Sequence, residues 1–355
     1  MFSGIRALQR ILMRHWLLVS ALIGLLGTAL ILRRPPRLDS GDLQVLWLLG
    51  VLSVSVKGLE VSGLTRNLAL RMEQGRGAPL KLTLFTFFLA MLVTNDVALL
   101  AVVPVTLLMG TRLKGLLVIL EALAANAGSA LTPFGNPQNL YIYWHFDIQP
   151  LMFMREMSPL VLFYLILLAG GASLVRIEPR PACPAAAVAV GRGAGMHLAL
   201  LALVIAVVLN LLPLWVTPLV PLWALAFDRR SLAIDFELLA IFACFFALSD
   251  NLREMLGAHF LHPDHLFLMA AGLSQIVSNV PAALLLAPHT EDWRALAWGV
   301  SVGGFGSLIG SLANLIAWRL YVRGRTGDEV VRFSLVFMLL GGLAFLAGVG
   351  LYYLV

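Results

Sequence analysis

Long apolar runs separated by short polar segments make up most of the chain. A helix needs about 20 apolar residues to cross the ~30 Å hydrocarbon core of a bilayer. The pattern therefore predicts an all-α polytopic membrane protein with about nine membrane spans and two re-entrant hairpins. The apolar runs cover residues 16–32, 43–62, 82–109, 116–146, 159–175, 196–212, 232–248, 266–288, 293–321 and 333–354, with a shorter run at 218–227.

Two of these runs, 82–109 and 266–288, are too long for one span and too short for two spans with a loop. Each has a polar centre, Thr94-Asn95-Asp96 in the first and Ser278-Asn279 in the second. The first run has basic flanks, whereas the flanks of the second are acidic or neutral. We expect two re-entrant hairpins that enter the membrane from opposite faces.

Two further runs, 116–146 and 293–321, carry glycine and polar residues where a membrane helix should be continuous. Unpaired backbone groups in hydrocarbon cost several kcal/mol each, so such breaks are tolerated only inside protein or beside a cavity. We expect two broken helices. The candidate substrate- and ion-binding residues of the hairpin centres and the breaks are Thr94, Asn95, Asp96, Gly128, Ser129, Thr132, Gly135, Asn136, Asn139, Ser278, Asn279, Ser307, Gly310, Ser311 and Asn314.

The two halves of the chain carry these features in the same order. Thr94-Asn95 aligns with Ser278-Asn279, Gly128-Ser129 with Gly306-Ser307, and Asn139 with Asn314. Such internal symmetry is common in transporters. It predicts a first repeat at 1–177, a cytoplasmic linker at 178–195 and a second repeat of inverted topology at 196–355.

Charged residues predict the orientation, because Lys and Arg gather in cytoplasmic loops. A cytoplasmic N-terminus places eighteen of the 25 Lys and Arg residues inside and six outside, with Lys57 in a span. The apolar run at 16–32 has no small-residue cleavage site, so we interpret it as a retained first span. The loop with Arg33, Arg34 and Arg37 falls on the outer side, against this rule.

Composition excludes several functions. With 60% hydrophobic and 12% charged residues, the net charge of +6 is explained by the basic loops and not by nucleic-acid binding. The two cysteines, Cys183 and Cys244, form no metal or disulfide pattern. No nucleophile–base arrangement or phosphate loop is present, so we expect no enzyme and no cofactor. The histidines of the outer loops, His262 and His265 among them, are interpreted as solvated loop residues.

Half-helices that meet within a membrane direct their N-terminal dipoles to one place, which favours an anion. Side-chain and unwound backbone oxygens beside them suit a sodium ion, the only metal expected, or a neutral solute. A packed kink with internally satisfied polar groups is the alternative. Asp96 is an ionisable group deep in the membrane and is therefore a candidate site for H⁺ or Na⁺; its alternative role is a helix N-cap. Lys57 and Glu60 are spaced to pair on one helix face.

The motifs resemble the ion transporter superfamily, in its arsenite permease and citrate carrier branch, which is related to divalent-anion/sodium symporters. The strings that carry the resemblance are Thr94-Asn-Asp-Val97, Thr132-Pro-Phe-Gly-Asn-Pro-Gln-Asn139, Ser278-Asn-Val-Pro281 and Gly310-Ser-Leu-Ala-Asn314. The resemblance implies a homodimer, an elevator-like motion and binding sites at the hairpin centres and helix breaks. Where the symporters carry Ser-Asn-Thr at both centres, this chain has Asp96 and Val280, and Asp96 would repel a carboxylate substrate unless it is protonated or ion-paired.

Together these features predict a secondary active transporter of a small anion in the bacterial inner membrane, coupled to Na⁺ or H⁺. The lipid bilayer and the anionic solute are the expected partners. A sodium/proton antiporter and an arsenite or metalloid efflux permease are the alternatives.

Overall fold

The computed structural model describes residues 15–73, 77–109, 111, 113–175, 190–191, 193–256 and 265–355. Every regular element in these ranges is a helix. Most of the predicted linker at 178–195, as well as Arg6, Arg10, Arg14, Cys183 and His262, lies outside the described residues.

The helices before the linker include both arms of the first predicted hairpin and both parts of the first broken helix. They are α2 (Trp16–Leu32), α3 (Ser40–Val61), α4 (Leu64–Met72), α5 (Ala78–Val93), α6 (Asn95–Leu108), α7 (Lys114–Ser129), α8 (Pro137–His145) and α9 (Pro150–Leu174).

The helices after the linker repeat this pattern. They are α10 (Ala194–Val208), η1 (Leu214–Val216), α11 (Leu219–Phe227), η2 (Arg229–Leu232), α12 (Phe236–Leu256), α13 (Leu266–Val277), α14 (Asn279–Leu286), η4 (Ala287–His289), α15 (Trp293–Gly306), α16 (Leu312–Val322) and α17 (Gly327–Tyr352). The helix α10 begins at Ala194, inside the segment expected to be linker.

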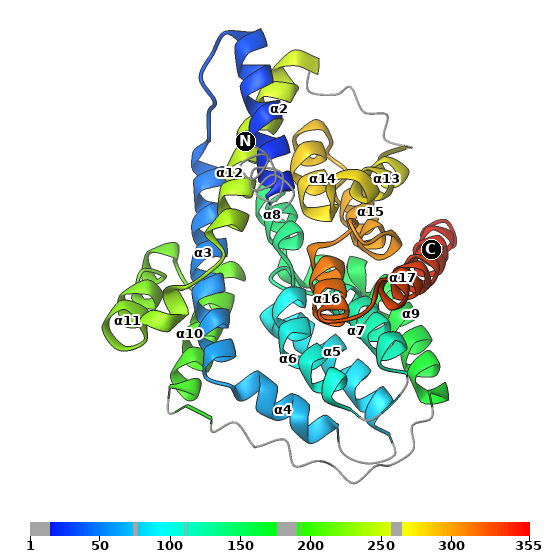
Figure 1. The fold of residues 1–355 in the computed structure, drawn as a ribbon. Coiled ribbons are helices and arrows are strands. Elements are labelled where there is room, and N and C mark those ends of the chain that lie inside the picture. The colour runs from blue at the N-terminus through cyan, green and yellow to red at the C-terminus, as the bar shows by residue number, and fades with distance from the viewer. Residues whose placement is uncertain are drawn as a thin grey trace, which may run out of the picture.

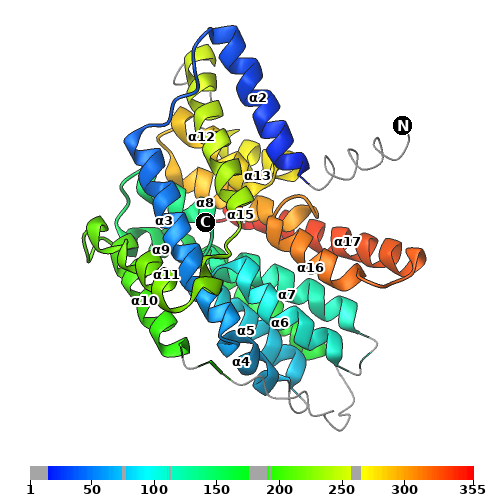
Figure 2. The ribbon, with the colours of Figure 1, turned by 60° about the vertical axis from the view of Figure 1, so that its left-hand side comes forward.

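The helices form two groups, which we name here. The flanking group contains α2, α3 and α10–α12, in which α12 packs against both α2 and α3. The hairpin group contains α5–α8 and α13–α16, and both of its hairpins lie on the same side of α3 (Figure 1). In the turned view α3, α10 and α11 again lie together, away from α7 and α16 (Figure 2). The helices α3 and α12 therefore form the wall that the hairpins face.

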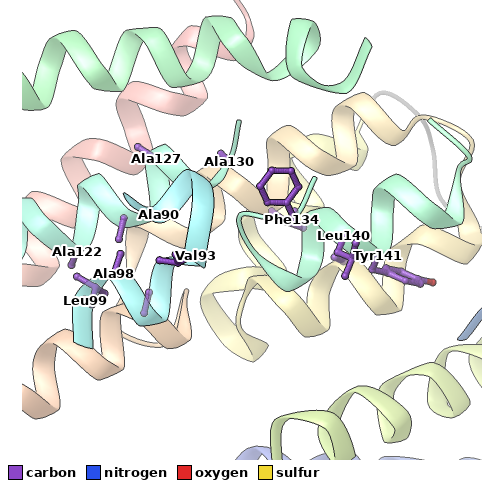
Figure 3. Close-up of a cluster of buried hydrophobic side chains, with 14 of the residues drawn as sticks. Ala90, Val93, Ala98, Leu99, Ala122, Ala127, Ala130, Phe134, Leu140 and Tyr141 are labelled. Atoms are coloured by element: carbon purple, nitrogen blue, oxygen red, sulfur yellow. The ribbon is translucent and has the colours of Figure 1, made fainter. Parts of the chain in front are cut away.

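Small side chains allow the first hairpin to pack closely on α7. Figure 3 shows this region, where Ala90 and Val93 of α5, Ala98 of α6 and Ala122 of α7 are all buried. A Cβ at Gly128 would collide with the carbonyl oxygen of Phe87. Between membrane helices, where lipid is as apolar as leucine, such close backbone contact contributes much of the association. Gly128 is thus required for packing.

In the part of the chain that the structure describes, four helices are long and apolar enough to cross a bilayer: Ser40–Val61, Pro150–Leu174, Arg229–Met255 and Gly327–Tyr352. Shorter apolar helices of 10–17 residues include the hairpin arms α5, α6 and α13, and the fourth arm, α14, has eight residues. These lengths agree with a polytopic membrane protein, whereas the number of spans stays a prediction. The sequence pattern missed α4, a short amphipathic helix that buries Thr65 and Ala69 and exposes Arg66 and Arg71.

An ion network joins the loop after α2 to α12. Arg34 Nη2 lies 2.7 Å from Asp250 Oδ2, and Arg34 Nη1 pairs with Glu254. Arg34 Nε donates to Asn251 Oδ1 at 3.3 Å. These contacts tie the loop at Arg34 to the C-terminal part of α12.

Candidate functional site

The two hairpins turn through the same unusual backbone conformation. The arms α5 and α6 meet at Thr94, which has φ 88° and ψ 151°, and the arms α13 and α14 meet at Ser278, which has φ 78° and ψ 155°. Non-glycine residues avoid this region, and each such residue costs about 1–3 kcal/mol. The same strained conformation therefore occurs at equivalent positions of the two hairpins.

Each hairpin tip is bonded to the broken helix of its own half. The Asn95 N–H donates to Gly135 O at 3.2 Å, and the Asn279 N–H donates to Gly310 O at 2.9 Å. The conformation of Thr94 and Ser278 places these N–H groups directly after the turn. Gly135 and Gly310 therefore join the tips to the breaks.

One asparagine in each half satisfies the backbone carbonyls that the break leaves free. Asn139 Nδ2 donates to the carbonyl oxygens of Ser129, Ala130 and Thr132 at 3.1–3.2 Å. Asn314 Nδ2 donates to those of Gly304 and Ser307, both at 2.8 Å. A helix end without such donors would leave buried carbonyls unpaired. Asn139 and Asn314 thus stabilise the breaks.

The remaining polar side chains of the first break bond to one another or to the hairpin. Ser129 Oγ donates to Asn126 O at 3.1 Å, and Asn136 Nδ2 donates to Ser129 Oγ at 3.2 Å. Thr132 Oγ1 donates to Met91 O at 2.8 Å, which ties the break to α5. These contacts correspond to the alternative in which polar groups of a break satisfy each other.

In the second break, the side chain of Gln275 of α13 stabilises the break through hydrogen bonds to its backbone. Sequence reasoning missed this residue. Its Oε1 accepts from the Ser307 N–H at 2.7 Å, and its Nε2 donates to Gly303 O at 2.6 Å. Ser307 Oγ in turn accepts from the Gly310 N–H at 3.0 Å. The two halves therefore hold their breaks with different side chains.

Asn126 of α7 connects the two halves at the centre of the hairpin group. Its Oδ1 accepts from Asn95 Nδ2 at 3.3 Å and from Ser311 Oγ at 2.9 Å. Its Nδ2 donates to Asn314 Oδ1 at 2.8 Å. The position aligned with Asn126 in the second half is Gly304. Sequence reasoning missed Asn126 as a site residue. The signal available in the sequence was an amide side chain in an apolar run, one turn before the first break.

A cavity of about 130 Å³ lies where four helices begin. Its wall contains residues at the start of each helix: Asn95 and Asp96 of α6, Pro137 and Gln138 of α8, Asn279 and Val280 of α14, and Leu312 of α16 with its N-cap Ser311. The backbone N–H groups of Gln138 and Leu312 have no acceptor among the described residues. Since a helix N-terminus carries about half a positive charge, four of them favour an anion in this cavity.

Three carboxylates and one guanidinium also line this cavity: Asp96, Asp235, Glu237 and Arg319. Asp96 Oδ1 is buried and has no hydrogen-bond partner among the described residues. The N–H of Asp96 is capped by Asn95 Oδ1 at 3.0 Å, so the Asp96 side chain does not serve as the N-cap of α6. The alternative role of Asp96 as a helix N-cap is therefore absent from the structure, and its carboxylate lines the cavity.

A second cavity of about 340 Å³ adjoins the first and extends along α3 and α12. It is lined by Thr94 and Asp96 of the hairpin and by Lys57 and Glu60 of α3. Lys57 Nζ lies 3.0 Å from both oxygens of Glu60, which confirms the predicted pairing. The pair keeps the only lysine of a predicted span neutralised beside this cavity.

Six of the fifteen predicted site residues line one of these two cavities: Thr94, Asn95, Asp96, Ser278, Asn279 and Ser311. The other nine lie outside both and act in packing or in the hydrogen bonds of the breaks: Gly128, Ser129, Thr132, Gly135, Asn136, Asn139, Ser307, Gly310 and Asn314. Sequence reasoning missed Asp235, Glu237 and Arg319, which reach the site from other elements. Within the described ranges, no group of three His, Cys, Asp or Glu residues could hold a metal.

Comparison with known proteins agrees with this architecture. Residues 10–303 match the citrate transporter family, CitMHS. The chain belongs to this family. It is 35% identical over 304 residues to the inner membrane protein YbiR of Escherichia coli, covering 76% of this chain and 77% of YbiR. It is 32% identical over 250 residues to the uncharacterized transporter MJ0456 of Methanocaldococcus jannaschii, covering 67% and 69% of the two chains.

The uncharacterized transporter Rv2684 of Mycobacterium tuberculosis is 24% identical over 335 residues, covering 78% of each chain. Membership in the family shows that this chain is a membrane transporter and not an enzyme. Family membership and the apolar helices together indicate a multi-pass membrane protein, and the relative YbiR is named an inner membrane protein.

Proposed function

We propose that the chain is a secondary active transporter that carries a small anion across the inner membrane, coupled to Na⁺ or H⁺. The observation that carries this proposal is the convergence of four helix N-termini on one cavity. Asn279 Nδ2 and the Gln138 side chain make no hydrogen bond within the described residues, and both residues line the cavity. These donors are free to bind the oxygens of a carboxylate or an inorganic oxyanion.

The coupling ion binds at Asp96. The cavity wall carries three carboxylates against one guanidinium, so a free anion meets net negative charge there. Neutralisation of Asp96 by H⁺ or Na⁺ removes this repulsion and allows the anion to bind at the helix N-termini. Binding therefore proceeds in order, cation first, and this order couples the two fluxes.

Alternating access follows from the position of the cavities. Both lie between the hairpin group and the wall formed by α3 and α12, so movement of the hairpin group along this wall would carry the site from one face to the other. The apolar side chains exposed on α9 and α17, such as Leu162, Ile166 and Leu339, provide surface for lipid or for the second subunit of a homodimer.

The excess of carboxylates also favours a second candidate, a sodium/proton antiporter in which Asp96 exchanges the two ions. Proteoliposomes separate the two functions. Uptake of labelled phosphate, sulfate, arsenite, citrate and succinate is measured under imposed Na⁺ or H⁺ gradients. The proposal expects gradient-driven accumulation of one anion. Sodium-driven proton movement that occurs without any anion would instead identify the antiporter.

A further inference from the structure

Asp96 and Asp235 are the two carboxylates that line both cavities. They therefore lie where the smaller cavity opens into the larger one. Asp96 belongs to the tip of the first hairpin, whereas Asp235 directly precedes α12 in the flanking group. The two acids thus face a common space from two groups of helices.

No basic side chain pairs with either acid in the described part of the chain. Asp96 Oδ1 has no partner, and Asp235 Oδ1 accepts only the Leu238 N–H, at 3.1 Å. Among the other charged groups of the smaller cavity, Glu237 pairs with His15 at 2.7 Å, and Arg319 makes no ion pair with a described residue. In the larger cavity, Lys57 is held by Glu60. The local excess of negative charge is left for a bound cation.

A neutral oxygen ligand lies in the same wall. The Gln138 side chain is 2% exposed, lines the smaller cavity together with both acids and makes no hydrogen bond within the described residues. Its amide oxygen is therefore available to a cation in the cavity. Carboxylate and amide oxygens are the ligands that hard cations prefer, and two neighbouring carboxylates also hold one shared proton.

We infer that Asp96 and Asp235 together bind one monovalent cation, H⁺ or Na⁺, at the junction of the two cavities. This inference rests on the proposed function and adds Asp235 as a specificity-determining residue. Because the two acids belong to different groups of helices, the complete site exists only while the hairpin tip lies beside the start of α12. Movement of the hairpin group separates the acids and lowers the affinity for the cation.

The test must separate the charge of Asp235 from its contact with α12. Asp235→Asn retains a side-chain oxygen for the Leu238 N–H, since Asn caps helices as well as Asp, and removes only the charge. Asp292 provides a matched control. It caps α15 through the Ala295 N–H at 3.0 Å and lines neither of the two cavities. Asp96→Asn and the double variant complete the set.

Binding of ²²Na⁺ to the purified full-length protein is measured from pH 5 to 9, together with the protons taken up or released over the same range. Asp96→Asn and Asp235→Asn are each expected to lower the affinity for the bound cation by roughly tenfold. If the cation is Na⁺, ²²Na⁺ binding weakens; if it is H⁺, the proton titration changes. The double variant should be no weaker than the more affected single variant, because one site is lost. Asp292→Asn should match the unchanged protein.

Equality of Asp235→Asn with Asp292→Asn in both measurements would overturn the inference, as would full additivity in the double variant. Neither measurement requires the transported anion. Failure of the proposed function would give a different result, in which cation binding depends on both acids but no anion accumulates in proteoliposomes.

Discussion

The two hairpin tips share a backbone and differ in chemistry. Thr94 and Ser278 have nearly the same dihedral angles, and the asparagine after each donates to a glycine carbonyl in the adjacent break. The residue after the asparagine differs: it is Asp96 in the first tip and Val280 in the second. The Asn95 amide is held by Asn126, whereas Asn279 Nδ2 makes no hydrogen bond with any residue that the structure describes. Backbone geometry is thus common to both tips, and their side-chain chemistry differs.

This difference suggests a division of roles. The first tip is the charged and internally braced side, suited to the coupling ion. The second tip is neutral and presents an unengaged amide, suited to an anion. Gly304 contributes to the second role, because a Cβ there would lie 3.0 Å from Asn279 Nδ2. An asparagine at this position, as in the first half, would occupy the space around that amide.

Removal of the connection between the halves should have the largest effect. Asn126→Ala leaves Asn95 Nδ2, Ser311 Oγ and Asn314 Oδ1 without their buried partner. We expect a loss of about 4 kcal/mol in the free energy of unfolding, since each orphaned group costs about 1–3 kcal/mol. Unfolding in detergent micelles under increasing SDS measures it. A loss below about 1 kcal/mol would show that the halves are held together elsewhere.

Neutralising the charged tip comes next. Asp96→Asn should lower cation-driven accumulation of the anion by about 100-fold, because the order of binding no longer depends on a cation. Exchange of labelled for unlabelled anion without a gradient should persist. Accumulation is measured in proteoliposomes, with Asp292→Asn as the control. Intact ion coupling in Asp96→Asn would remove the functional difference between the two tips.

The neutral tip has a corresponding test. Gly304→Ala should displace the Asn279 amide and raise the KM for the anion about tenfold, while the cation dependence stays unchanged. Kinetics of uptake at saturating cation give both values. Gly342→Ala is the matched control, because a Cβ there meets no atom within 4 Å. A change in cation dependence with an unchanged KM would reverse the assignment of the two tips.

The asparagines of the breaks should behave alike. Asn139→Ala removes the donor to three carbonyl oxygens and Asn314→Ala the donor to two. We expect both to lower the free energy of unfolding by about 2 kcal/mol, with Asn139→Ala the larger effect. SDS titration of the two variants side by side checks this. A loss in one half alone would contradict the equivalence of the two breaks.

Relief of strain at the turns should give the smallest effect. Thr94→Gly and Ser278→Gly remove a cost of about 1–3 kcal/mol and add about 1 kcal/mol of chain entropy in the unfolded state. Each should therefore stabilise the protein by about 1 kcal/mol. The corresponding alanine variants keep the strain and serve as controls. Thermal unfolding in detergent is the measurement, and stabilisation at one turn only would show that the turns carry different strain.

Local interruptions in the sequence were sufficient to locate the helix breaks. Thr94-Asn95, Ser278-Asn279 and the polar segment before Asn139 stand out because a membrane helix needs a continuous apolar run and an unbroken ladder of hydrogen bonds. The pairing of Lys57 with Glu60 was also predictable, since three residues of separation place both on one helix face.

The site itself could not be predicted in the same way. Asp235 and Arg319 are charged residues inside the apolar runs 232–248 and 293–321, and Gln275 is one polar residue in the run 266–288. The pairing of Arg34 with Asp250 and Glu254 was not predicted either. These contacts join residues far apart in the chain, and no local pattern records them.

The sequence by itself therefore determined the family, the membrane-embedded helical class and the places where helices break, because each depends on composition or on neighbouring residues. The tertiary structure decided which polar groups brace the breaks and which face the cavity. Asn139 and Asn279 look equally suited to bind a ligand in the sequence. Asn139 Nδ2 is engaged by three carbonyl oxygens, whereas Asn279 lines the cavity and its Nδ2 makes no hydrogen bond within the described residues. The reason is physical: a polar side chain can bind a solute only where folding leaves its hydrogen-bonding atoms without an internal partner.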